Sequence, residues 1–149
     1  FNDHVATSEG QLVEAIRTLE AANVTDLVLD IRYNGGGMLT IASQLAYMVA
    51  GPGPTAGKTF ERLLYNDRNT FHATEESSRT PFQTTTRGFS TVPGQPLPTL
   101  NLPRVFVLAG GDTCSASESI LNGLRGAGVT VVHVGGRTCG KPYGFHPQD

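Results

Sequence analysis

The sequence predicts an α/β domain with a mainly parallel sheet flanked by helices. Three apolar, β-branched runs of strand length alternate with segments whose apolar residues recur at helical spacing, and glycine-rich turns separate them. The length of 149 residues fits one domain. Apolar residues make up 38% of the chain and charged residues 16%, which allows a buried core and argues against disorder.

The N-terminal part is predicted to contain a helix, a strand and a second helix. Hydroxyl residues precede a helical apolar pattern, so we expect a capped helix over residues 8–22. Residues 26–33 form an apolar run typical of a strand buried on both faces. The turn at residues 34–37 ends that strand, and helical spacing resumes over residues 41–50.

The middle of the chain carries weaker signals. Residues 51–57 are rich in glycine and proline and are predicted to form turns, and residues 60–65 are predicted to form a strand. Residues 66–103 are rich in Thr, Ser, Pro and Gly, with scattered apolar residues. We expect them to form an irregular excursion from the core, with at most short strands.

Regular structure is predicted to resume after the excursion. Residues 104–109 are typical of a buried strand, a helix is expected from about Ser115 to Gly126, and residues 129–134 are typical of the next buried strand. Residues 143–145 look like the start of another extended segment.

Composition excludes several classes of protein. The net charge of −2 argues against a nucleic-acid partner, which would need a concentrated basic face. No apolar run approaches the roughly 20 residues of a membrane span. The chain opens at Phe1 rather than Met, so a leader could have been removed. Two cysteines are too few for a disulfide scaffold and lack metal-site spacing.

Ser115 and Lys141 are the residue types of a serine nucleophile and a lysine base. Ser115 follows a strand and a Gly-Gly turn and opens a helix, which places its hydroxyl beside N–H groups that can stabilise an oxyanion. Lys141 lies in a Gly-Lys-Pro turn after the next strand, so the two turns can meet at one sheet edge. Burial among apolar groups would make its amine easier to deprotonate.

Both residues also have simpler interpretations. Ser115 and Glu118 have the spacing of a capping box, in which the serine merely caps the helix. An exposed turn is the usual place for a lysine. The order of strand, glycine turn, serine and helix, together with the second turn, favours the catalytic interpretation.

Three blocks of sequence resemble the S41 peptidases, the carboxyl-terminal processing or tail-specific proteases. The family pattern is Asp-Leu-Arg-Asn-Asn-x-Gly-Gly at the end of a strand, then Ser-Ala-Ser-Glu, then Thr-x-Gly-Lys. Here the blocks read Asp30-Ile31-Arg32-Tyr33-Asn34-Gly35-Gly36-Gly37, Ser115-Ala116-Ser117-Glu118 and Thr138-Cys139-Gly140-Lys141. They come in family order and are jointly specific. The resemblance spans most of the chain outside residues 66–103.

The resemblance implies Ser115 as the nucleophile and Lys141 as the general base. It selects Ser115 over the neighbouring hydroxyls of Thr113 and Ser117. It also implies further members of the site: Ala116 with Gly36 or Gly37 as N–H donors of an oxyanion hole, and Glu118 and Thr138 as supporting residues.

The implied fold is a ClpP/crotonase-like layered domain, of which this chain looks like an excised catalytic core. The implied activity is endopeptidase cleavage of a polypeptide through an acyl-enzyme, with no metal and no organic cofactor. Bacterial members are mostly exported to the periplasm, so a periplasmic or secreted location is expected. The peptide-binding PDZ module and several closing strands of the family are not visible, and the oligomeric state is left open.

Two positions depart from the family pattern. Some members carry an acidic residue in the helix after the serine, where this chain has Asn122, Arg125 and Gly126. Some carry a glutamine four positions after the lysine, where this chain has Phe145. What orients Lys141 is therefore open, and a non-catalytic module that binds a peptide or another ligand on the same scaffold is the alternative.

Other candidates are weaker. Residues 51–59 imitate a phosphate-binding loop, but Pro52 stands where that motif needs glycine, and the segment follows a helix and precedes a strand. His4 or His146 could replace Lys141 as the base, since a related branch of the family uses histidine. Cys114 and Cys139 could form a disulfide if the two turns converge, or Cys139 could pair with a cysteine beyond Asp149.

Overall fold

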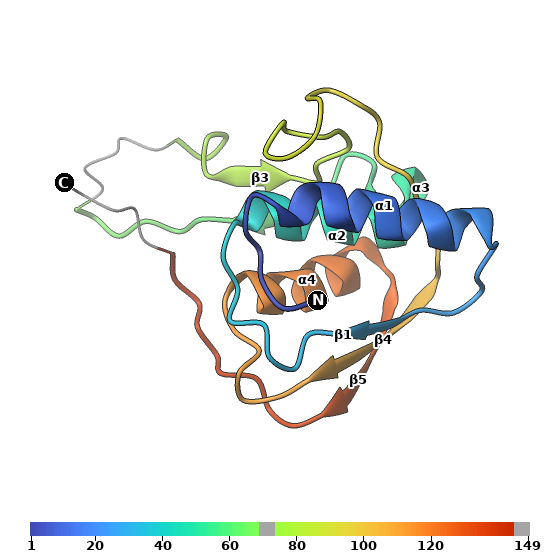
Figure 1. Cartoon of the computed structure of the whole chain (residues 1–149). Helices are drawn as coiled ribbons and strands as arrows, with labels where there is room; N and C mark the ends of the chain where they lie inside the picture. Colours follow the sequence, from blue (N-terminus) through green and yellow to red (C-terminus); the bar gives the residue numbers. More distant parts are fainter. Residues whose placement is uncertain (69–73, 145–149) are drawn as a thin grey trace.

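The core of the computed structural model, which describes residues 1–68 and 74–144, is a three-stranded parallel sheet (Figure 1). Its strands are β1 (Val28–Asp30), β4 (Arg104–Ala109) and β5 (Thr130–Gly135), in the order β1-β4-β5. Strand β4 has the predicted bounds, and β5 is shifted by one residue. Strand β1 is shorter than residues 26–33, because the Asp30 carboxylate accepts the N–H of Arg32 and turns the chain.

Three helices pack on one face of this sheet. They are α1 (Ser8–Ala21), α2 (Leu39–Ala50) and α4 (Ala116–Ala127), and each lies where the periodicity predicted a helix. Figure 1 shows all three above the sheet, with α4 nearest to it and α1 and α2 beyond α4. Alternate β4 residues, Val105 and Val107, are fully buried against them. The parallel α/β architecture predicted from the sequence is therefore confirmed.

The other face of the sheet differs from the prediction that the strands are buried on both faces. Val28 of β1 is 60% exposed and Val134 of β5 is 46% exposed. In β4, burial alternates between buried and half-buried residues. An apolar run indicates that a strand can be buried on both faces. It does not indicate whether these 149 residues include the helices or loops that would cover the second face.

The connection after α2 contains a short helix and a hairpin. Residues 51–57, expected to be turns only, include α3 (Pro52–Thr55), and β2 (Thr59–Arg62) pairs antiparallel with β3 (Arg79–Pro81). Lys58 donates to the Ala127 carbonyl oxygen at the end of α4, over 2.9 Å. This contact places a cation where the helix dipole favours one. The phosphate-loop imitation is thus a helix-to-strand connection, which disfavours nucleotide binding.

The later part of the excursion is fastened to the helices by one buried carboxylate. Glu9, in the first turn of α1, is 1% exposed. It accepts hydrogen bonds from the α2 side chain Gln44 and from a loop on the excursion; the loop donors are Arg87 N, Phe89 N, Ser90 N and Thr91 Oγ1. Burial raises the pKa of this carboxyl, but the donors outweigh burial and lower it to about 2.

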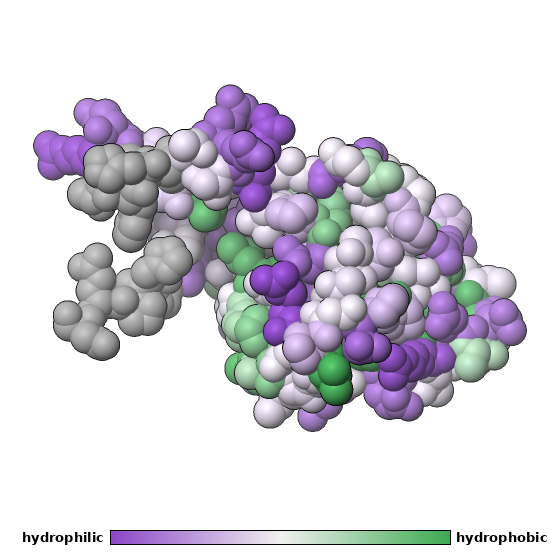
Figure 2. Space-filling view, turned by 90° about the horizontal axis from the view of Figure 1, so that it is seen from above, coloured by the Kyte–Doolittle hydropathy of each residue, from purple (hydrophilic) through white to green (hydrophobic). Residues whose placement is uncertain are grey.

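The face that carries α1 and the excursion is mostly hydrophilic or neutral, with only small hydrophobic patches (Figure 2). Among the described residues, no helix is both long enough and apolar enough to cross a membrane.

Candidate active site

Ser115 occupies a sharp turn between β4 and α4. Its backbone has φ 57° and ψ −119°, a conformation that a side chain other than glycine rarely adopts. Such strain persists only where the surroundings enforce it, and it is concentrated at functional sites. In α/β-hydrolases a strained strand-to-helix turn exposes the nucleophilic serine. Ser115 also forms the capping box with Glu118 that its spacing predicted, so its strained backbone is what distinguishes it from an ordinary helix cap.

The neighbouring hydroxyls have structural partners. Thr113 Oγ1 donates to the Ile31 carbonyl oxygen over 2.8 Å, and Ser117 Oγ donates to the Asn34 carbonyl oxygen over 2.9 Å. Both residues are fully buried, whereas Ser115 is half-buried. Among the three candidates, Ser115 is the one that a substrate could reach.

The Glu118 carboxylate joins the Ser115 turn to the Lys141 turn. Its Oε2 accepts the backbone N–H of Ser115 and that of Lys141, each over 2.9 Å. Its Oε1 accepts the Thr138 hydroxyl over 2.7 Å and the Gly140 N–H over 2.8 Å. Burial opposes ionisation of this carboxyl, but the four donors outweigh burial and hold its pKa below the ordinary value.

A disulfide between Cys114 and Cys139 forms a second connection between the same turns. The two Cα atoms lie 5.3 Å apart, and the Cys139 N–H donates to the Thr113 carbonyl oxygen over 3.1 Å. The internal pairing that convergence of the turns would allow is therefore formed. The one group of potential metal ligands among the described residues, Cys114, Glu118 and Cys139, has both of its sulfurs in this bond.

The glycine turn after β1 packs directly against Ser115. A Cβ atom on Gly36 would lie 2.8 Å from both the Cys114 carbonyl oxygen and the Ser115 Cβ. Gly36 has φ 101° and Gly37 has φ 128°, so both positions favour glycine. The close approach brings the first sequence block against the second.

Asn34 connects the glycine turn to the Ser115 turn by hydrogen bonds and is completely buried. Its carbonyl oxygen accepts the Cys114 N–H over 3.1 Å, and its Oδ1 accepts the Gly36 N–H over 3.0 Å. Asn34 therefore braces the glycine turn by hydrogen bonds. Arg32, on the other side of Tyr33, pairs with the exposed Asp30 carboxylate over 2.7 Å.

The N–H groups of the turn differ in what they bind. Gly36 N–H is already donated to Asn34, whereas within residues 1–68 and 74–144 the N–H groups of Gly37 and Ala116 have no hydrogen-bond partner. Ala116 begins α4, where helix geometry leaves N–H groups unpaired. Two free donors therefore flank the Ser115 turn.

The candidate bases differ in where they lie. Lys141 is half-buried, with its main chain fixed beside that of Ser115 through Glu118. His4 is buried against the glycine turn. His146 and Phe145 lie outside the described residues.

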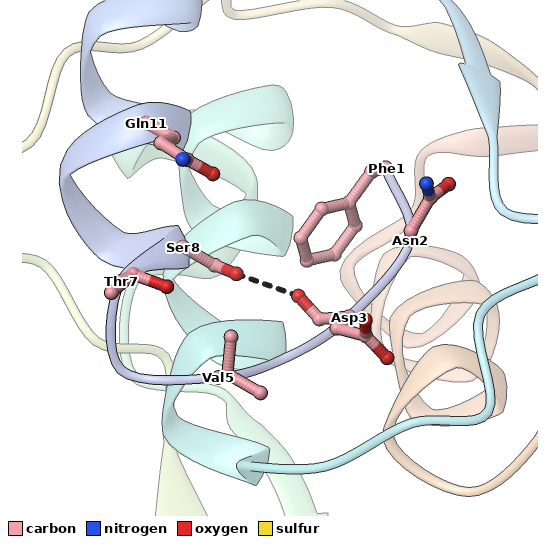
Figure 3. Close-up of a pocket in the computed structure, with 7 residues that line it drawn as sticks. All are labelled: Phe1, Asn2, Asp3, Val5, Thr7, Ser8 and Gln11. Carbon is pink, nitrogen blue, oxygen red and sulfur yellow. Dashed lines mark hydrogen bonds between the residues drawn. The ribbon is translucent and has the colours of Figure 1, made fainter.

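A hollow of about 280 Å³ lies in the N-terminal segment (Figure 3). Its wall includes Phe1, Val5 and Gln11, and Ser8 Oγ donates to the Asp3 carbonyl oxygen across it over 2.7 Å. A smaller hollow of about 90 Å³ borders Glu118; its wall also includes Leu121, Asn122, Arg125, His133 and Thr138. Ser115 lines neither hollow.

Solved structures share this fold. A candidate S41 protease from Bacteroides fragilis NCTC 9343 is 27% identical, with a TM-score of 0.73 over 95% of this chain. A photosystem II D1 C-terminal processing protease is 19% identical, with a TM-score of 0.57 over 95% of this chain. The chain spans only 35% and 30% of those proteins, respectively. Comparison with curated proteins gives no match.

The three sequence blocks, now seen to meet around Ser115, agree with the comparison with family models. The model of peptidase family S41 matches residues 1–146, nearly the whole chain. The chain belongs to peptidase family S41.

Proposed function

We propose that this chain is the catalytic core of a serine endopeptidase that cleaves polypeptides through an acyl-enzyme. One observation carries the proposal: Glu118 holds the backbone of Ser115 and that of Lys141 on the same carboxylate oxygen. The strained backbone of Ser115 and the two free N–H groups beside it add support. Membership of a peptidase family supports the general class of reaction.

In the proposed reaction, Lys141 takes the proton of the Ser115 hydroxyl, and the serine oxygen attacks the scissile carbonyl carbon. The N–H groups of Gly37 and Ala116 stabilise the oxyanion, each contributing about 3 kcal/mol. Gly37 is preferred to Gly36, because the Gly36 N–H already binds Asn34. Lys141 then protonates the leaving amine. In the second half of the reaction, water takes the place of the serine: Lys141 accepts its proton, water attacks the ester carbon, and Lys141 returns the proton to the departing Ser115 oxygen.

The proposed location is periplasmic or extracellular. The Cys114–Cys139 disulfide supports it, because such bonds persist in oxidising compartments and are rare in the cytosol. Cleavage near the carboxyl terminus of a substrate is a narrower proposal, supported by the fold shared with a D1 C-terminal processing protease.

The test is hydrolysis of a quenched fluorescent peptide by the full-length protein. Ser115→Ala and Lys141→Met should each lower kcat by roughly a thousandfold or more while leaving the melting temperature within a few degrees. Matched controls are Ser119→Ala, one turn along α4, and Lys58→Met, at the far end of that helix. Both controls should keep near-normal turnover.

A serine-directed phosphonate separates the peptidase from a binding module on the same scaffold. A covalent adduct on Ser115, found by mass spectrometry and absent from Ser115→Ala, supports the peptidase. A folded full-length protein that binds peptide without hydrolysis and forms no adduct would leave the binding module as the better description.

A further inference from the structure

His4 contacts the same glycine turn that packs against Ser115. Its backbone N–H donates to the Gly36 carbonyl oxygen over 3.1 Å, and its ring Nδ1 lies 3.2 Å from the same oxygen. Nδ1 also lies 2.9 Å from Asn34 Oδ1. A Cβ on Gly37 would lie 2.5 Å from the His4 carbonyl oxygen, so the His4 segment lies in close contact with the turn.

These contacts determine which nitrogen of the His4 ring carries the hydrogen. Both atoms near Nδ1, the Asn34 Oδ1 and the Gly36 carbonyl oxygen, are acceptors, because the Gly36 N–H already donates to Oδ1. Nδ1 must therefore carry the hydrogen. Nε2 is buried without a partner among the described residues, and burial lowers the pKa of His4, which keeps the ring neutral.

The geometry assigns His4 as a positioning residue for the Gly36–Gly37 peptide, an inference that rests on the proposed peptidase function. In a trans peptide the C=O and the N–H point in opposite directions. Two donors from His4 hold the Gly36 carbonyl oxygen, so the Gly37 N–H points away from His4. That N–H is the proposed oxyanion donor, and reversing the peptide would replace it with a carbonyl oxygen.

A peptide group between two glycines needs hydrogen bonds to keep it in one orientation. Glycine adopts positive and negative φ with similar ease, so rotation of the Gly36–Gly37 peptide meets little steric resistance. The His4 backbone alone offers one donor to the Gly36 carbonyl oxygen. The ring adds a second donor that simultaneously binds the Asn34 side chain, which itself fixes the Gly36 N–H.

The test compares three variants of the full-length protein, because amide side chains can replace either ring nitrogen. His4→Asn places an N–H donor near the Nδ1 position, whereas His4→Gln places it near Nε2, and His4→Leu supplies none. We expect His4→Gln and His4→Leu to lower kcat roughly 10- to 100-fold with KM within about twofold, and His4→Asn to stay within about threefold of the native protein. Affinity for a peptide boronate should fall in parallel with kcat.

A second measurement makes the inference independent of activity. Glycine labelled with ¹³C at the carbonyl and with ¹⁵N selects amides that follow another glycine, and this chain has four such pairs. In a Ser115→Ala background, His4→Gln should shift the Gly37 amide signal and speed its hydrogen exchange, while His4→Asn should not.

The two hypotheses then fail in different ways. Hydrolysis that survives Ser115→Ala would remove the proposed function and leave the Gly37 comparison intact. An unchanged Gly37 amide in His4→Gln, or equal losses of kcat in His4→Asn and His4→Gln, would overturn the positioning role even in a working peptidase.

Discussion

The backbone N–H groups of Ser115 and Lys141 donate to the same atom, Oε2 of Glu118, each over 2.9 Å. Two turns that lie on either side of α4 and β5 in the sequence thus share one anchor. The arrangement fixes the backbone of both proposed catalytic residues without using either side chain. Glu118 is itself fixed, because it lies in the first turn of α4.

Replacing Glu118 with glutamine should loosen this anchor. One of its two oxygens becomes an NH₂ group that faces N–H or hydroxyl donors, so at least two hydrogen bonds are lost. We expect the free energy of unfolding to fall by about 1–3 kcal/mol and kcat to fall roughly 10- to 100-fold. Denaturant unfolding and peptide hydrolysis measure the two effects.

The control for Glu118→Gln is Glu14→Gln, which makes the same change at an exposed position of α1. It should leave both measurements unchanged. If Glu118→Gln also left kcat unchanged, the placement of the Lys141 turn by this carboxylate would have no catalytic importance.

Acid should weaken the attachment of the excursion through Glu9. The native pKa is about 2 and the ordinary value is 4.5, so the ionised carboxylate stabilises the fold fully above pH 4.5. This contribution, about 3 kcal/mol, is lost as the pH falls from about 4.5 to about 2. Glu9→Gln should therefore be less stable at pH 7 and should show a flatter loss of stability over that acidic interval, measured by thermal unfolding.

An identical pH profile for Glu9→Gln and the native protein would contradict this account. Proteolysis offers a second measurement, since the loop at residues 86–91 should be cut faster in the variant. Glu14→Gln again serves as the control, because Glu14 lies on the exposed side of the same helix.

The sequence could predict Glu118 only as part of a local pattern. Spacing from Ser115 marks it as a cap, but spacing cannot show that a turn beyond the next strand also binds it. Glu9 was missed altogether, because an acid in the first turn of a helix is ordinary. Its loop partners lie in a stretch of the excursion that has no hydrophobic period, so no signal linked the two segments.

The elements of the sheet were predictable because each strand is a continuous apolar run. Strand β4 was predicted to the residue for this reason. Burial of the second sheet face was not predictable, because Val28 and Val134 would look the same in the sequence whether or not other segments cover them. Burial depends on distant parts of the chain, whereas periodicity is local.

Gly36 and Gly35 provide a matched pair for the glycine turn. A Cβ on Gly36 would lie 2.8 Å from Ser115 Cβ, and the residue has φ 101°, whereas a Cβ on Gly35 would meet nothing within 4 Å. Gly36→Ala should therefore lower the free energy of unfolding by about 2 kcal/mol or more and abolish hydrolysis. Gly35→Ala should change both by little, as measured by denaturant unfolding and peptide assay.

Similar behaviour of these two variants would mean that the turn does not press on Ser115 as closely as the structure has it. A smaller loss of unfolding free energy on Gly36→Ala in a Ser115→Gly background would support the contact directly, since that background removes one of the atoms that the new methyl group meets.

The disulfide and Glu118 hold the same two turns, so their effects should depend on one another. Thiol titration of this chain under non-reducing, denaturing conditions should find no reactive thiol. The pair Cys114→Ser and Cys139→Ser, with a sequence separation of 25, should lose about 3–4 kcal/mol of stability by the loop-entropy relation. The kcat of this double variant should fall less than that of Glu118→Gln, because Glu118 still binds the Lys141 backbone. Adding Glu118→Gln removes the second connection, so the loss of kcat in the combined variant should exceed the product of the separate losses. Independent, multiplicative losses would show that the two connections do not act on a common turn.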